Sequence, residues 1–352
     1  MRARMNTSGW VAIFLGVLQV AAGYATPGWA AGSTYEVWVT NQGSHKVQIL
    51  DGKTLEMIAE VAAGTKPHNV TFTADGKFAW VANVGSSNVT VIDAANRKAV
   101  ATIPAGKSCH AVTFSPDGKR AYVANPGDGT VSVIDAIKHD LVKTVPVGKA
   151  PALVTFSGDG KKAYVSNGGD ATLSVIDTAT LEVTKTVPNV GKGAMGMVRS
   201  MDGKRLIVTG GGENKVSVVD TARDAVIKEL VHGKDAHGVA LTPDGKQAWV
   251  PNRLSGDVSI FDVATGELVG TIPNVGDKTD IIAFSADGTR AFVTTRGEAQ
   301  TGDPKVLSGK EPGLSVIDVA SRTVIKKVSL GGDPHGVAVR RAGGAPAGAS
   351  GY

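Results

Sequence analysis

Val131-Ser132-Val133-Ile134-Asp135 is one of seven copies of a short stretch in which an apolar pair is followed by aspartate, and this repeat decides the fold. The aspartates that end the copies are Asp51, Asp93, Asp135, Asp177, Asp220, Asp262 and Asp318. They are spaced by about 42 or 43 residues, except for the last step of about 56. A period near 42 is typical of propeller blades and not of helical repeats.

Each repeat carries the same order of signals: an apolar strand, an Asp-Gly turn, a second strand, an Asn/Gly loop, the strand that ends in aspartate, and a Val/Ile-rich strand. Asp-Gly is typical of type I′ hairpins, so each repeat is predicted to be a four-stranded antiparallel sheet. The six dipeptides are Asp75-Gly76, Asp117-Gly118, Asp159-Gly160, Asp202-Gly203, Asp244-Gly245 and Asp287-Gly288. Strands such as 131–134 carry apolar or small side chains on both faces. Each sheet must therefore be covered on both sides, which a closed ring of seven blades achieves.

The first repeat lacks its innermost strand. The chain opens between Tyr35 and Thr40 with the pattern of a second strand, and no Asp-Gly turn precedes it. Residues 335–340 match residues 68–73 and are followed only by a Gly/Ala/Ser-rich tail. We therefore predict an all-β, seven-bladed propeller in which this C-terminal strand completes the first blade, since two strand edges would otherwise face solvent.

The ends of the chain differ in composition from the repeats. Arg2 and Arg4 precede an apolar run of about 16 residues, which is short for a membrane span, and small residues up to Ala30 suit cleavage. We expect a signal peptide at 1–30, one propeller domain at 31–341 and a flexible tail at 342–352. The protein is then periplasmic or secreted and does not span a membrane. Losing two arginines lowers the net charge of +5 to about +3, which is only mildly basic.

Four second strands carry a recurring signature that ends in asparagine: Val37-Trp38-Val39-Thr40-Asn41, Ala121-Tyr122-Val123-Ala124-Asn125, Ala163-Tyr164-Val165-Ser166-Asn167 and Ala248-Trp249-Val250-Pro251-Asn252. Together with turns such as Phe114-Ser115-Pro116-Asp117-Gly118, this resembles the YVTN-repeat seven-bladed β-propeller family over roughly residues 35 to 340. Relatives in that family include exported surface and periplasmic propellers and the haem d1 domain of cytochrome cd1 nitrite reductase. The resemblance implies the fold and leaves the activity open, because members bind DNA, associate with haem or resemble lactonases.

One side chain per repeat enters the innermost strand at the mouth of the predicted channel. In ring order these are His335, His68, His110, Ala152, Met195, His237 and Asp280. Imidazole and carboxylate are ligands for zinc, copper or iron. The four histidines and Asp280 are therefore candidate ligands of a transition metal or haem. The alternative is that a duplicated histidine only caps its loop, although Ala152 and Met195 indicate that the fold does not require it.

Other polar residues are expected on the same face and are candidate ligand-binding residues: Lys107, Lys149, Lys192, Lys234, Asn83, Asn125, Asn252 and Arg253. The lysines would make this face positive and suited to a small anionic ligand, a haem carboxylate or a phosphodiester. The alternative is that they are solvated turn residues. The long seventh spacing comes from an insertion at 296–312, predicted to be either a mobile flap over the channel or a tolerated loop extension.

No motif brings a nucleophile and a base together, so we predict no catalytic residue; Cys109 beside His110 is the nearest candidate. We expect a monomeric, exported binding or scaffold protein that engages a ligand or a protein partner through the channel-mouth face, and not an enzyme. The alternative is a metal- or haem-associated protein of redox or lactonase-like type. A third possibility is single-stranded nucleic-acid binding, which the scarcity of loop aromatics disfavours.

Overall fold

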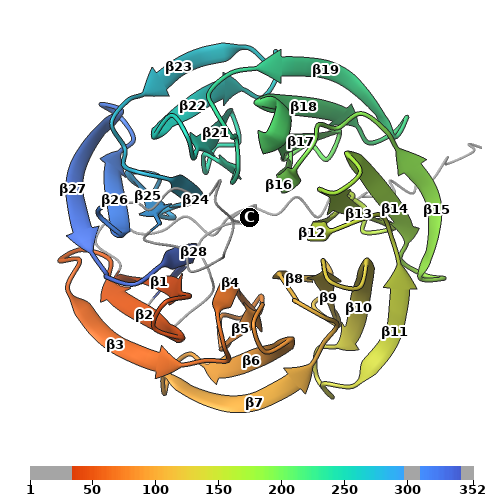
Figure 1. Cartoon of the computed structure of the whole chain (residues 1–352), viewed down its shortest axis with the longest axis horizontal. Helices are drawn as coiled ribbons and strands as arrows, with labels where there is room; N and C mark the ends of the chain where they lie inside the picture. Colours follow the sequence, from red (N-terminus) through yellow and green to blue (C-terminus); the bar gives the residue numbers. More distant parts are fainter. Residues whose placement is uncertain (1–33, 297–309, 342–352) are drawn as a thin grey trace, which may run out of the picture.

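The computed structural model describes residues 34–296 and 310–341, which form seven four-stranded sheets arranged in a ring (Figure 1). The innermost strands are β28 (Pro334–Arg341), β4 (Pro67–Phe72), β8 (Ala111–Phe114), β12 (Pro151–Phe156), β16 (Ala194–Arg199), β20 (Ala240–Leu241) and β24 (Thr279–Phe284). The second strands are β1 (Tyr35–Asn41), β5 (Phe78–Asn83), β9 (Arg120–Asn125), β13 (Lys162–Asn167), β17 (Arg205–Gly210), β21 (Gln247–Asn252) and β25 (Arg290–Thr295). The predicted seven-bladed, all-β propeller is confirmed.

The outer half of each blade completes the sheet toward solvent. The third strands are β2 (Lys46–Asp51), β6 (Asn88–Asp93), β10 (Thr130–Asp135), β14 (Thr172–Asp177), β18 (Lys215–Asp220), β22 (Asp257–Asp262) and β26 (Gly313–Asp318). The outermost are β3 (Met57–Ala62), β7 (Lys98–Pro104), β11 (Leu141–Pro146), β15 (Glu182–Val187), β19 (Ala225–Val231), β23 (Leu268–Ile272) and β27 (Thr323–Ser329). A short 3₁₀ helix, η1 (Gly211–Glu213), follows β17.

Packing between blades buries the middle strands. The four central residues of β10 are buried, whereas five of the six residues of β15 are exposed. Aromatic side chains cross the blade interfaces: Trp38 of β1 meets Phe72 of β4 edge-on, with ring centroids 5.2 Å apart. Such pairs stabilise the fold beyond the burial of apolar surface alone. The neighbouring blades thus cover the apolar residues on both faces of each blade.

The first blade is completed by the two ends of the described chain. β1 pairs with β2 on one side and with β28 on the other, with Val37 opposite Val339. The carboxylate of Glu36 is buried on β1 and accepts from Arg340 Nη1 at 3.0 Å and from Arg97 Nη2 at 2.7 Å. The predicted closure by the C-terminal strand is confirmed.

The Asp-Gly turns have a different geometry from the one predicted. Gly76 has a φ of +67°, but none of the six aspartates of these dipeptides has a positive φ. A type I′ turn needs positive φ at both central residues, so that prediction was wrong. Instead, Gly76 N donates to Thr73 O at 2.8 Å and Thr73 N donates to Phe78 O at 2.9 Å, which makes a longer loop. The hydroxyl of Thr73 then donates to Asp75 Oδ1 at 2.6 Å and holds the loop.

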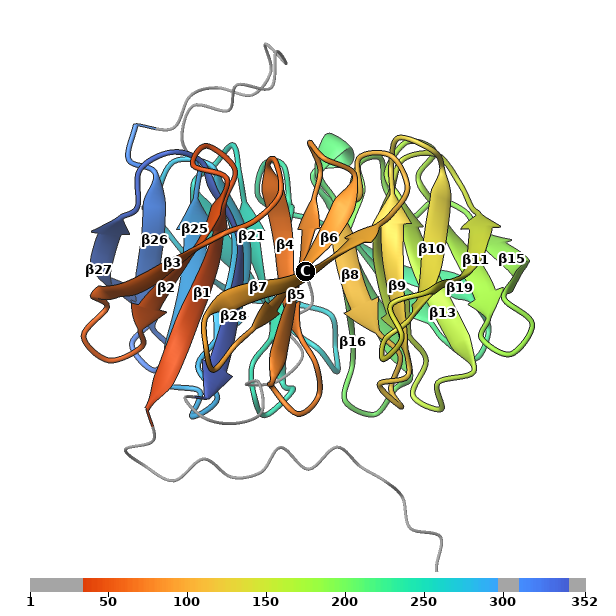
Figure 2. The ribbon, with the colours of Figure 1, turned by 90° about the horizontal axis from the view of Figure 1, so that it is seen from below.

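Seen from the side, the ring presents its loops at two opposite faces (Figure 2). Since neighbouring strands are antiparallel, the Asp-Gly turns lie at one face and the loops that enter the innermost strands lie at the other. The predicted signal peptide, most of the predicted flap (297–309) and the predicted tail lie outside the described residues. Within the described ranges, no helix is long and apolar enough to cross a membrane.

Candidate functional site

Five ionisable side chains from five neighbouring blades meet at the start of the innermost strands. β28, β4 and β24 supply His335, His68 and Asp280, while His110 and His237 lie just before β8 and β20. All five are buried, with exposures between 0% for Asp280 and 7% for His110. The structure therefore brings together the residues that the sequence placed at the channel mouth.

Close contact between neighbouring backbones holds these side chains in place. Gly238 N donates to Asp280 O at 3.0 Å, and a Cβ on Gly238 would lie 2.7 Å from that oxygen. A Cβ on Gly336 would similarly lie 2.5 Å from His68 O, to which the hydroxyl of Thr40 donates at 2.8 Å. Only glycine permits these approaches, which bring His237 and His335 beside their neighbours in the next blade.

Two of the imidazoles have their tautomer fixed by a backbone carbonyl. His335 Nδ1 lies 3.2 Å from His68 O, and His110 Nδ1 lies 2.9 Å from Ala152 O. A carbonyl oxygen only accepts, so Nδ1 carries the hydrogen in both rings. Burial lowers the pKa of His110 to about 4 and that of His335 well below its ordinary value. Both imidazoles are therefore neutral near pH 7, with a lone pair on Nε2.

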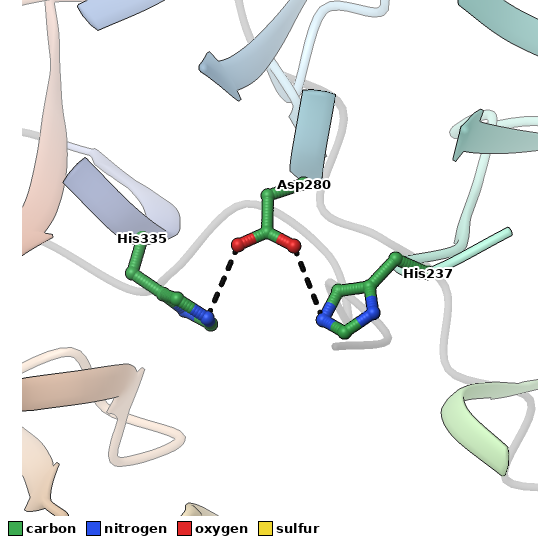
Figure 3. A group of neighbouring side chains, drawn as sticks. All are labelled: His237, Asp280 and His335. Carbon is green, nitrogen blue, oxygen red and sulfur yellow. Dashed lines mark ion pairs between the residues drawn. The ribbon is translucent and has the colours of Figure 1, made fainter. Parts of the chain in front are cut away.

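The carboxylate of Asp280 lies between two imidazoles (Figure 3). His237 Nε2 is 3.1 Å from Oδ1, and His335 Nε2 is 3.1 Å from Oδ2. These are ion-pair distances, but the directions are not those of a hydrogen bond, and neither oxygen has a hydrogen-bond partner among the described residues. Burial raises the pKa of Asp280 to about 6, against the opposing effect of Arg296.

His68 joins the other histidines into a stack. Its ring centroid lies 3.6 Å from that of His335 and 3.7 Å from that of His110, with interplanar angles of 39° and 41°. Burial, followed by the electrostatic repulsion that His110 would exert if both rings were protonated, lowers the pKa of His68 well below its ordinary value. The stack is thus made of neutral rings that cover one another.

Two arginine–aspartate pairs border the cluster. Arg296 donates to both oxygens of Asp333, with Nε–Oδ1 at 2.9 Å and Nη2–Oδ2 at 2.5 Å, while its Nη1 lies 3.5 Å from Asp280 Oδ2. Arg253 donates to both oxygens of Asp235, at 2.8 and 3.1 Å. Bidentate pairs of this kind satisfy most of the charge on each guanidinium.

Sequence reasoning missed Arg296, Asp333 and Asp235 as site residues. The alignment of the repeats contains a pattern that could have identified them. Arginine follows the second strand only at Arg253 and Arg296, and aspartate stands two residues before the channel-mouth position only at 235 and 333. These four residues belong to the three adjacent blades that carry His237, Asp280 and His335.

Lys278 contributes a buried amine to the same region. Its side chain belongs to a residue that is 7% exposed, and Nζ has no hydrogen-bond partner among the described residues. Burial lowers its pKa from the ordinary value. A buried ammonium group without a partner is costly, so Lys278 is a candidate contact for an anionic group.

The three predicted asparagines serve the blades themselves. Asn83, Asn125 and Asn252 are fully buried. Asn125 Nδ2, for example, donates to Thr130 Oγ1 and Ser132 Oγ at 3.1 and 3.0 Å. Their donors are already used within the blade, so these asparagines are left out of the site proposed below.

The predicted lysines lie on loops that also carry acidic groups. Lys107, Lys149, Lys192 and Lys234 are all exposed. The backbone N–H groups of the first three donate to the carboxylates of Asp128, Asp170 and Glu213, respectively. Cys109 has a different environment: it is buried, and burial raises the pKa of its thiol to about 11. Burial and a raised pKa both disfavour a reactive thiolate at Cys109.

Comparison with known proteins agrees with the fold. The family model described as the cytochrome D1 heme domain matches residues 34–149 and 81–195, and that of the YNCE-like beta-propeller matches residues 152–245. The seven-bladed beta-propeller protein Rv1057 of Mycobacterium tuberculosis is 30% identical over 101 residues, which are 29% of this chain and 23% of that protein. This match spans less than a quarter of the relative's length.

Three solved structures share the architecture at low sequence identity. Hydrazine synthase of Kuenenia stuttgartiensis has a TM-score of 0.62 at 24% identity, over 72% of this chain and 76% of that one. The dihydro-heme d1 dehydrogenase NirN, in complex with DHE, scores 0.64 at 21% identity, over 88% and 75% of the two chains.

The third, a functionally unknown protein from Desulfotomaculum acetoxidans, scores 0.73 at 15% identity, over 87% and 99%. At these identities the three structures show likeness of fold alone. From the closed ring of seven blades and these partial matches, the chain is a seven-bladed β-propeller that is similar over part of its length to the cytochrome D1 heme domain and to the YNCE-like beta-propeller.

Proposed function

We propose that this chain is an exported, periplasmic binding protein that holds a ligand at the mouth of its channel. The ligand site is the cluster formed by His68, His110, His237, Asp280 and His335, together with the flanking Lys278. Binding, as opposed to catalysis, is the function that a rigid ring with buried ligating groups supports best.

The observation that carries this proposal is a set of buried polar atoms without partners at one place. They are both carboxylate oxygens of Asp280, Nδ1 of His237 and Nζ of Lys278. Each unsatisfied buried group lowers stability by about 1–3 kcal/mol. The fold does not need this polarity, because Ala152 and Met195 occupy the equivalent positions in two other blades. Polar groups kept at such a cost are typical of ligand sites.

Mass spectrometry of the untagged mature chain, purified from the periplasm of its own host, tests the proposal. Native spectra should show a non-covalent adduct that is absent from denatured spectra. The adduct should be lost in His335→Ala and kept in His139→Ala. His139 is a matched control, since it lies in the loop between β10 and β11 and packs against Trp80 with ring centroids 5.3 Å apart. The proposal fails if both variants carry the same adducts as the wild type.

A haem-associated role is the second candidate, and the match to the cytochrome D1 heme domain model favours it. Neutral imidazoles are suitable axial ligands for haem iron. The packing fits less well, because His68, His110 and His335 are each more than nine-tenths buried and their rings cover one another. A macrocycle would require the stack to open.

An absorbance titration with haem separates this candidate from the first. A haem-binding propeller should develop a Soret band that is lost in the His68→Ala, His335→Ala double variant. A spectrum identical to free haem would exclude haem as the ligand and leave binding of another ligand intact.

Export is supported by the N-terminal pattern of two arginines, an apolar run and small residues before position 31. N-terminal sequencing of the protein from the periplasmic fraction should begin at Ala31. A chain that is found in the cytoplasm with residues 1–30 still attached would contradict this part of the proposal.

A further inference from the structure

We infer that the ligand at the channel mouth is a divalent transition-metal ion, bound by His237, Asp280 and His335. This inference rests on the proposed function, because it names the ligand of the same site. It narrows the five candidate ligands of the sequence to three.

The spacing of the donor atoms fits one ion. One ligand atom from each of the three residues lies within 4.8 Å of the other two. The two contacts between an imidazole Nε2 and a carboxylate oxygen are both 3.1 Å. Donor atoms at metal bond lengths of about 2.0–2.2 Å are roughly 3.3–3.5 Å apart in tetrahedral geometry. Small side-chain movements therefore bring all three groups into coordination distance.

The tautomer of His335 favours a cation between its ring and Asp280. His335 donates from Nδ1 to a backbone carbonyl, so its Nε2 presents a lone pair to Asp280 Oδ2. Two acceptors that face each other at 3.1 Å repel, and the positive group beside them, Arg296 Nη1, lies 3.5 Å from Oδ2. A cation bound by both lone pairs removes the conflict.

Neighbouring groups orient the ring of His335 for metal coordination. The hydrogen bond from His335 Nδ1 to His68 O orients the ring, as outer-shell partners of metal-binding histidines do. The positive charge of Arg296 opposes a cation, but the guanidinium donates to both oxygens of Asp333. That bidentate pair balances much of its charge, although Arg296 Nη1 also lies 3.5 Å from Asp280 Oδ2.

The donor set selects the class of metal. Two imidazoles and one carboxylate suit zinc or iron(II), with at least one coordination position left for an exogenous ligand. Calcium and magnesium prefer sites made of oxygen ligands, so they are excluded here. A metal with an open position would give the channel mouth a means of binding a further small anion.

Titration of the mature, untagged, full-length chain after dialysis against a chelator tests the inference. Zn²⁺ should bind with a stoichiometry of one ion per chain, and Co²⁺ should develop visible absorption bands that Zn²⁺ displaces. Mg²⁺ and Ca²⁺ should not compete. His237→Ala, Asp280→Asn and His335→Ala should each weaken Zn²⁺ binding by more than about 100-fold, the upper range for losing only an outer-shell partner.

His139→Ala is the matched control, because His139 is an imidazole outside the proposed site, in the loop between β10 and β11, where it packs against Trp80. It should bind Zn²⁺ as the wild type does. Circular dichroism checks that each variant is folded, and the Co²⁺ spectrum of the wild type tests the site without any variant.

Absence of Zn²⁺ and Co²⁺ binding by the wild type would overturn the inference, and so would equal losses in His139→Ala and His335→Ala. If the metal fails but the adduct in native mass spectra still depends on His335, the proposed binding function stands with a different ligand. If both fail, the binding function fails as well.

Discussion

At the scale of single residues, Asp280 distinguishes this channel mouth from a structural ion-pair network. Its carboxylate is fully buried, contacts two neutral imidazoles and has no hydrogen-bond partner among the described residues. A buried carboxylate in that position reduces the stability of the free protein unless a cation or proton joins it. We therefore attribute the burial of this carboxylate to the proposed ligand site.

Asp280→Asn is expected to leave the metal-free protein at least as stable as the wild type, because it removes a buried charge and keeps the shape of the side chain. A gain of about 1 kcal/mol would raise the thermal midpoint by roughly 2–4 °C. Scanning calorimetry after chelator dialysis measures this. A fall of several degrees would show that Asp280 is mainly a structural partner of Arg296.

The sequence located the channel-mouth residues because the repeat register assigns each blade one equivalent position. It missed Arg296 and Asp333, since their pairing joins two blades and the arginine lies at the start of the insertion. It also assigned Asn83 to ligand binding, although Asn83 Nδ2 donates to Thr90 Oγ1 at 2.9 Å within its own blade. The position in the repeat predicts where a side chain leaves the backbone, but it does not predict which neighbouring groups form hydrogen bonds with it.

At the scale of elements, the aspartate that ends each third strand organises the loop that follows. Asp135 Oδ1 accepts from the backbone N–H groups of Ile137 and Lys138 at 2.9 and 2.8 Å. These bonds satisfy backbone donors that lie beyond the end of the strand and so hold the following turn. It predicted the turn type of the Asp-Gly dipeptides wrongly, because loop length and the Thr/Ser hydroxyl, and not the dipeptide alone, decide that geometry.

The backbone hydrogen bonds from Lys138 and Ile137 lower the pKa of Asp135 below its ordinary value of 3.8. A lowered pKa in the folded state contributes stability above 3.8 that is lost as the pH falls through the folded value. Asp135→Asn should therefore be less stable than the wild type well above pH 3.8, and the two thermal midpoints should converge below it. A difference that does not change with pH would contradict this role.

The buried histidines also titrate over this pH range, but they do so equally in the wild type and in Asp135→Asn. Their pKa values are lowered in the folded state, so protonation below their ordinary value of 6.5 destabilises wild type and variant alike. The difference between the two midpoints thus reports on Asp135 alone.

At the scale of the whole molecule, a ring is stable only if its two ends are joined. β28 and β1 supply that joint, and Arg340 strengthens it with bonds to Glu36 Oε2, Gly76 O and Ala94 O at 3.0, 2.9 and 3.0 Å. Sequence periodicity predicted this closure fully, because the missing strand of the first repeat had one matching segment at the other end.

Arg340→Met is expected to destabilise the protein by about 3 kcal/mol, since it leaves part of the buried Glu36 charge unpaired. Arg341→Met is the matched control, because Arg341 is the next residue on β28 and is exposed. Urea unfolding curves of the two variants measure the difference. Equal midpoints would show that Arg340 does not contribute to closing the ring.

Anomalous diffraction from crystals grown with Zn²⁺ tests whether a metal ion binds at the channel mouth of this ring. We expect a single strong peak between His237, Asp280 and His335, within about 2.0–2.2 Å of one ligand atom from each. A peak elsewhere, or no peak with these three side chains in their present arrangement, would contradict it.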